Sequence, residues 1–167
     1  MNRSFMETIY ERETSTVKSR ALQAITFGGL IAGTLDLTSA FIVTALRGGS
    51  YVRMLQSIAS GLLGADSFTG GAATAALGVL VHFTIAFIWT IVFYLASRKI
   101  KFLTAQPVAS GVLYGIAVYL FMYYVAVPLS AAPFQMPHTP DAIARDVFIH
   151  IICIGLPIAL VVRRFSK

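Results

Sequence analysis

Three ionisable side chains lie inside long apolar runs of this sequence. Asp36 lies in the run 28–43, and His82 and His150 lie in two later runs. A charged side chain at the centre of a membrane-spanning helix costs about 2.5–3.5 kcal/mol on insertion scales, so each group needs a partner. An aspartate beside a histidine can bind and release a proton near neutral pH. The three residues therefore form a candidate intramembrane polar cluster.

Several roles fit these residue types, and the sequence leaves them open. Polar groups can simply bond to each other between membrane helices, at about 0.6 kcal/mol per hydrogen bond. They can also relay protons or bind an ion. A haem or chlorin held by His82 and His150 from facing helices is a further possibility. No spacing motif supports a metal site, and none is predicted. We expect His82 to lie beside Asp36, and His150 to bond to nearby backbone.

The composition indicates whether the segments that carry these three residues are surrounded by water or by lipid. The chain has 167 residues, of which 57% are hydrophobic and only 12% charged, and its mean hydropathy is +0.77. Soluble domains carry about 25% charged residues, so this chain has too few polar groups to cover an apolar core in water. Lipid is its natural solvent. Because a spanning segment must satisfy its own backbone hydrogen bonds, we predict an all-α membrane protein.

Four apolar runs are long enough to cross a bilayer, which takes about 20 residues. They predict a four-helix transmembrane bundle with spans at about 21–46, 72–97, 106–128 and 142–162. Residues 21–167 then form a single transmembrane domain. Residues 1–20 form a polar head in which a short amphipathic helix is expected.

The connection between the first two spans predicts an additional amphipathic helix at about 51–63. At 100° per residue one arc is mostly apolar, and the opposite arc holds Arg53, Gln56, Ser57 and Ser60. Such a helix lies in the outer interface or folds back onto the bundle. It either fills the interface or covers a site beneath it.

The basic residues predict the orientation. Ten of the thirteen Lys and Arg residues fall in the head, the second connection and the tail, which lie on one side of the predicted membrane. The positive-inside rule places that side, and both termini, in the cytoplasm. The net charge of +6 therefore reflects membrane topology, and no nucleic-acid partner is predicted.

Small residues at four-residue spacing predict close helix packing. They are Gly29 and Gly33, Gly71 and Ala75, and Gly111 and Gly115. Pro157 is expected to kink the last span, because it cannot donate a backbone hydrogen bond. The second and fourth spans share the similar motifs "VLVH" and "VFIH", which fit either two duplicated hairpins or a chance match.

No known catalytic motif is present, so no enzyme activity is predicted. Arg145 and Asp146, near the outer end of the last span, are expected to form solvated or interfacial pairs with Asp141. The single cysteine, Cys153, excludes an intramolecular disulfide and is expected to be a small packed residue.

Four stretches, "GGLIAGTLD", "LQSIASGLLG", "TAALGVLVHFTIAF" and "YGIAVYLFMYYVAVPLSAAPF", resemble a set of small, uncharacterised bacterial membrane proteins with four spans. The chain is also loosely similar to the YagU-type inner-membrane proteins. The resemblance covers about residues 21–135. It implies a multi-pass protein of the bacterial inner membrane, and it implies no activity, substrate or cofactor.

The sequence favours a non-enzymatic accessory or structural subunit of a larger membrane assembly, whose partners are the lipid bilayer and other membrane subunits. The alternative is a small proton- or ion-coupled transporter that uses Asp36, His82 and His150. The third reading is a haem- or pigment-binding subunit.

Overall fold

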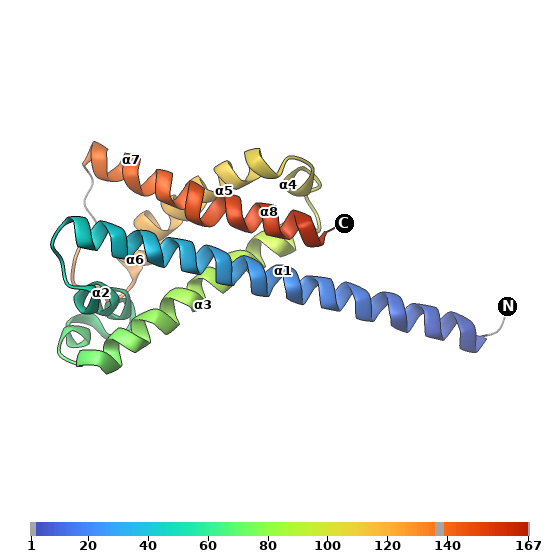
Figure 1. The fold of residues 1–167 in the computed structure, drawn as a ribbon, viewed down its shortest axis with the longest axis horizontal. Helices are drawn as coiled ribbons and strands as arrows, with labels where there is room; N and C mark the ends of the chain where they lie inside the picture. The colour runs from blue at the N-terminus through green and yellow to red at the C-terminus, as the bar shows by residue number, and fades with distance from the viewer. Residues whose placement is uncertain (1–2, 136–138, 167) are drawn as a thin grey trace.

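The computed structural model describes residues 3–135 and 139–166, and most of these residues are helical. It contains no strand within those ranges. Four helical stretches are long and apolar enough to cross a membrane: Val17–Leu46, Gly71–Ser97, Pro107–Leu129 and Pro140–Phe165. The predicted fold class is confirmed: the chain is an all-α, multi-pass membrane protein with four spans (Figure 1).

The first two spans are single helices, and the last two are interrupted. The first lies in α1 (Arg3–Leu46) and the second is α3 (Gly71–Ser97). The third comprises α5 (Pro107–Phe121), a π-helical turn (Met122–Ala126) and α6 (Val127–Leu129). The fourth comprises α7 (Pro140–Ile149), a second π-helical turn (His150–Gly155) and α8 (Leu156–Phe165).

Short elements connect the spans. Helix α2 (Tyr51–Leu63) and a 3₁₀ turn (Gly64–Phe68) follow α1, and α4 (Phe102–Ala105) precedes α5. Helix α1 is continuous from Arg3, so no break in the helix separates the expected head, residues 1–20, from the first span.

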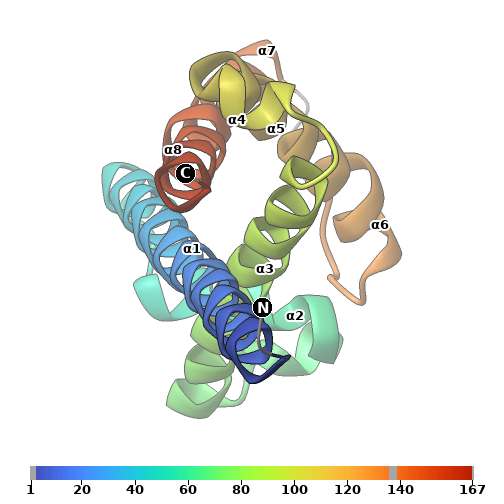
Figure 2. The ribbon, with the colours of Figure 1, turned by 90° about the vertical axis from the view of Figure 1, so that its right-hand side faces the viewer.

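The spans pack side by side around a common axis (Figures 1 and 2). Helix α1 packs against α3 and α8, and the last span packs against α5. Tyr114 of α5 completes the ring of contacts, because its hydroxyl donates to the Trp89 carbonyl oxygen of α3 at 2.6 Å. Both termini lie at one end of the bundle, and α2 lies at the other, which we call the α2 end (Figure 1).

Helices α1 and α3 approach each other through glycines that face aromatic rings. A Cβ added at Gly33 would lie 2.8 Å from the Phe83 ring, and Gly29 faces the Phe87 ring in the same way. The absence of a side chain lets each ring lie directly on the α1 backbone. These two glycines are therefore used within the chain.

Helix α5 and the last span are closer still, because backbone contacts backbone. A Cβ added at Gly115 would lie 2.6 Å from the Ile151 Cα, and one added at Gly111 would lie 2.9 Å from the Leu156 Cα. Gly155, which the sequence pattern did not single out, lies between them and faces the backbone of both glycines.

Gly71 does not take part in helix packing. It begins α3 with a φ of +57°, and an added Cβ would meet nothing within 4 Å. Its role is conformational, since few residues other than glycine adopt positive φ. Ala75, one turn later, is buried. The close approach on this part of α3 is instead made by Gly78, which contacts the backbone of Leu55 in α2.

Helix α2 occupies the predicted range but faces the bundle with its small and polar side. Gln56, Ala59 and Ser60 are buried, whereas the apolar Tyr51 and Leu62 are exposed. The Gln56 side chain donates to the Gly71 carbonyl oxygen at 3.1 Å and to the Thr74 hydroxyl at 3.2 Å. Between helices in lipid, small residues and hydrogen bonds mediate packing, while apolar side chains are equally stable facing lipid. That explains why the polar side is inside.

The two π-helical turns each lie just before a proline. Pro128 follows the turn Met122–Ala126, and Pro157 follows the turn His150–Gly155. A proline removes one helical hydrogen bond, and a wider π turn is a common accommodation of such a defect and often marks a functional site. The irregularity expected at Pro157 is therefore spread over the preceding turn.

Candidate functional site

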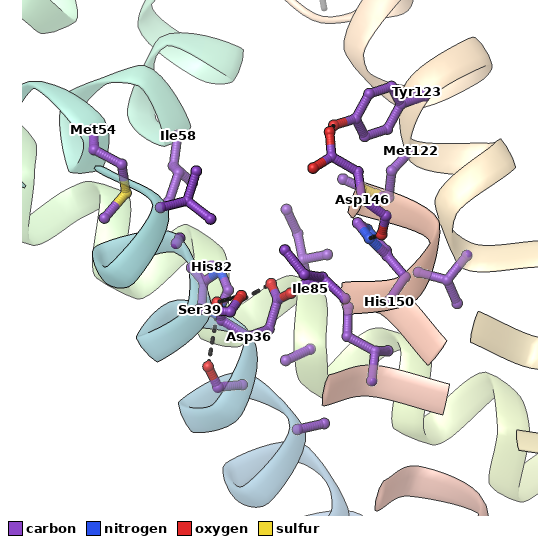
Figure 3. A pocket seen from close by; sticks show the side chains of 18 of the residues that line it. Asp36, Ser39, Met54, Ile58, His82, Ile85, Met122, Tyr123, Asp146 and His150 are labelled. Carbon is purple, nitrogen blue, oxygen red and sulfur yellow. Dashed lines mark hydrogen bonds and ion pairs between the residues drawn. The ribbon is translucent and has the colours of Figure 1, made fainter. Parts of the chain in front are cut away.

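A pocket of about 460 Å³ lies between the four spans and reaches the α2 end of the bundle (Figure 3). Its lining extends from Trp89 in α3 to Arg47 at the end of α1. Met54, Ser57 and Ile58 of α2 form part of the wall. The volume lies within the range of about 300–1,000 Å³ that is typical of small-molecule sites.

Asp36, His82 and His150 all line this pocket, although they come from three different spans. Counted along each helix at about 1.5 Å per residue, all three lie about 15–17 Å from the α2 end of their span. His82 Nε2 lies 4.0 Å from Asp36 Oδ2, and His150 lines the same pocket. The structure therefore brings the three sequence-predicted residues together in one place.

The Asp36 carboxylate faces the pocket without a hydrogen-bond donor from the described part of the chain. Its nearest polar partner is His82, whose Nε2 lies 4.0 Å from Asp36 Oδ2 (Figure 3). Hydroxyls nearby bond elsewhere: Ser39 donates to the Asp36 backbone carbonyl, and Thr38 donates to the Thr34 carbonyl. Neither of these two hydroxyls donates to the carboxylate.

His82 is oriented by the backbone of α1. Its Nε2 lies 2.9 Å from the Gly33 carbonyl oxygen, and because a carbonyl can only accept, Nε2 carries the proton. The direct hydrogen bond thus goes to backbone, and Asp36 lies just beyond hydrogen-bonding distance, at the separation of an ion pair when His82 is protonated.

His150 is also oriented by backbone, within its own helix. Its Nδ1 donates to the Asp146 carbonyl oxygen at 2.7 Å. The ring packs edge-on against Tyr119 and Tyr123, with centroids 5.6 and 6.3 Å away. The geometry is the one expected from the sequence for a histidine held by backbone, and the ring still lines the pocket.

A second carboxylate, Asp146, faces the pocket and was not expected there. The Tyr123 hydroxyl donates to Asp146 Oδ2, and Arg145 Nε donates to Oδ1 at 2.7 Å. Asp146 is buried and pairs with Arg145 inside the bundle, so the expectation that Asp146 would form a solvated or interfacial pair with Asp141 is wrong. The apolar surroundings make an internal partner necessary. The spacing of Asp146 and His150, four residues apart on one helix face, was the signal that could have revealed it.

Within the described ranges, no three His, Cys, Asp or Glu side chains are grouped closely enough to hold a metal ion. Cys153 is half-buried. The pocket therefore offers one unbonded carboxylate, one fully bonded carboxylate and two histidines, in a mostly apolar wall.

No known protein family matches this chain, and no curated protein or solved structure is similar to it. The resemblance drawn from the sequence stays a prediction, and function has to be argued from the pocket.

Proposed function

We propose that this protein is a small proton-coupled transporter of the bacterial inner membrane, with both termini in the cytoplasm and its pocket reached from the outer side. The observation that carries the proposal is the Asp36 carboxylate, which faces a pocket inside the membrane-spanning region, receives no hydrogen bond from residues 3–135 and 139–166, and has His82 at 4.0 Å. Polar groups that serve only to join helices are normally bonded, and Asp36 is not.

The charge on Asp36 must be balanced inside the membrane. An unpaired charge there costs several kcal/mol, so the carboxylate requires a bound proton, a protonated His82 or a bound ligand. A group that holds either a proton or a ligand links the binding of the two. That linkage is the minimal chemistry of proton-coupled transport.

The fold also offers points at which the bundle can change shape. Tyr123 and His150 both line the pocket, and both belong to π-helical turns that precede a proline. Local loss of regular hydrogen bonding makes such turns suitable hinges in the third and fourth spans. Helices α1 and α3, which carry Asp36 and His82, are uninterrupted.

The orientation follows from the charges at the two ends. The α2 end carries Arg47, Arg53 and Arg145, whereas the α3–α4 connection, with Arg98, Lys99 and Lys101, and the last turn of α8, with Arg163 and Arg164, lie at the terminal end. The positive-inside rule then places the mouth of the pocket outside the cytoplasm.

Proteoliposomes that contain the full chain and an internal pH indicator test the proposal. They are exposed to a panel of organic cations, carboxylates, neutral solutes and metal ions. At least one class should move protons in the wild type and in Asp66→Asn, a matched change at an exposed aspartate, but not in Asp36→Asn. If no class moves protons in an Asp36-dependent manner, the transporter proposal fails.

A second candidate, an accessory subunit of a larger assembly, is favoured by a different observation. The N-terminal part of α1 projects beyond the other helices (Figure 1). A helix that projects beyond its bundle offers a surface on which a partner can pack. Stoichiometric co-purification in mild detergent, lost when residues 2–14 are deleted, is the expected result. A monodisperse single-component particle would count against it.

A further inference from the structure

We infer that the pocket binds a small amphipathic organic cation, such as a protonated amine or a quaternary onium ion, with Asp36 as its counter-ion. This inference rests on the proposed function and names the substrate class of the same site. The juxtaposition that carries it is one unbonded carboxylate at the inner part of a pocket whose other charges are compensated or lie at its rim.

The charge inventory of the pocket wall singles out Asp36. On the fourth span, Arg145 and Asp146 pair at 2.7 Å and cancel. Each of the two histidines directs one ring N–H toward a backbone carbonyl oxygen. Tyr123 donates its hydroxyl to Asp146. From α1, Arg47 is exposed at the rim.

The rest of the wall suits an apolar ligand body. Its inner and middle parts include Ile85, Trp89, Met122 and Ile154, and α2 adds Ile58. Methionine adapts to ligands of irregular shape, and the face of an aromatic ring such as Trp89 attracts cations. An apolar wall around one half-buried carboxylate is complementary to a cation with an apolar body.

Binding of a cation exchanges it for a proton. The protonated Asp36 carboxyl loses its proton as the cation arrives, so the products are a carboxylate–cation pair and a released proton, and the charge of the filled pocket does not change. The proton leaves through the pocket that Asp36 lines, because His82 Nε2, the nearest ring nitrogen, already carries a proton that it donates to the Gly33 carbonyl oxygen. The exchange avoids an unpaired charge in the membrane at every stage.

An organic anion is the competing class, because Arg145 and two histidines line the same pocket. However, the Arg145 guanidinium is already paired with Asp146, and Asp36 would repel an anion unless it stayed protonated. The cation is therefore favoured, and the anion is an outcome of the test.

Equilibrium dialysis of the purified full chain in detergent compares tetraphenylphosphonium with tetraphenylborate, which has the same shape and the opposite charge. The wild type should bind the phosphonium and release a proton for each cation bound in a weakly buffered solution. Asp36→Asn should weaken binding by about thirtyfold or more, the scale of losing one partner of a buried charge pair. It should also abolish the proton release.

Two control variants distinguish loss of the Asp36 carboxylate from misfolding of the protein. Asp66→Asn should bind as the wild type does, and Asp36→Glu, which keeps the carboxylate, should retain phosphonium binding and proton release. Equal phosphonium binding by wild type and Asp36→Asn at matched thermal stability overturns the inference, and so does a preference for the borate.

The two proposals fail separately. If only carboxylates or neutral solutes drive proton movement in proteoliposomes, the proposal of proton-coupled transport stands and the proposal of an organic-cation substrate is refuted. Asp36-dependent phosphonium binding with proton release, but without proton movement across liposomes, would keep the cation site and refute transport.

Discussion

Asp36 and Asp146 face the same pocket from opposite sides, and the two carboxylates differ in their hydrogen bonding (Figure 3). Asp146 accepts hydrogen bonds from Tyr123 and Arg145, so both of its oxygens are occupied. Asp36 accepts none from the described residues, and only His82 lies near it, at 4.0 Å. A carboxylate with all its bonds made holds helices together, whereas one with its bonds open is available for a ligand or a proton.

The helix pairs that carry these two residues also differ in how closely the helices pack. Helix α5 and the last span are in backbone contact at Gly115 and Gly155, whereas α1 and α3 meet through phenylalanine rings on Gly29 and Gly33. Rings can tilt, and backbones cannot yield without moving a whole helix. The fully bonded aspartate thus lies on the pair in backbone contact, and the open one lies on the pair that meets through aromatic rings.

The largest effect is expected where backbone meets backbone. Gly155→Ala places a Cβ against the backbone of Gly111 and Gly115 and should lower the free energy of unfolding by about 3 kcal/mol, the upper end for overpacking. Gly33→Ala, which meets the Phe83 ring, should cost about 1 kcal/mol, the lower end. Reversible unfolding in mixed detergent micelles, followed by circular dichroism, measures both. Equal losses of unfolding free energy for the two variants would contradict the distinction between the two helix pairs.

Loss of the bonded aspartate should be the next largest effect. Asp146→Ala leaves the Arg145 guanidinium and the Tyr123 hydroxyl without their acceptor. We expect a loss of about 2 kcal/mol, because breaking a buried pair is costly and the partly exposed Arg145 recovers some solvation. The same unfolding titration checks it. A loss below about 0.5 kcal/mol, the scatter of neutral surface changes, would contradict a structural role.

Tyr123→Phe isolates one bond of the same cluster. It removes only the hydroxyl that donates to Asp146 and keeps the ring that packs against Tyr119 and His150. The expected loss is about 1 kcal/mol, since Arg145 still pairs with the carboxylate. Ligand binding at Asp36 should not change, and a large change there would mean that the two sides of the pocket act as one network.

The smallest effect on stability is expected at Asp36, where the effect on binding is largest. Asp36→Asn removes no hydrogen bond made by the described residues and removes a charge from the membrane interior. Stability should stay within about 0.5 kcal/mol of the wild type or rise. Thermal midpoints measured beside Asp66→Asn check this. A loss as large as that of Asp146→Ala would make Asp36 structural as well.

The four spans and α2 could be predicted from the sequence, because they depend on local properties. A run of apolar residues long enough to cross lipid must be helical wherever it lies in the bundle. The same holds for Gly29, Gly33, Gly111 and Gly115, whose small size allows close packing against any neighbour. Gly71 shows the limit of that pattern, since its position at a helix start with positive φ gives it another role.

The polar side of α2 and the role of Asp146 could not be predicted in this way. Hydrophobic patterning suggests which side of a helix is apolar, but in lipid an apolar side is stable either outward or inward. Gln56 and Ser60 are buried because Gly78 lets α2 approach α3, a contact between segments that the sequence does not relate. Likewise, Asp146 meets Tyr123 from another span.

The sequence by itself determined that this chain is a membrane protein with four spans. It also determined that Asp36, His82 and His150 lie at similar depth in those spans. Only the tertiary structure decided that Asp146 is bonded and Asp36 is open. The physical reason is that hydropathy and depth follow from composition and from rise per residue along one helix. Hydrogen bonding between spans depends on how each helix is rotated and how closely it packs, and here the glycine contacts set both.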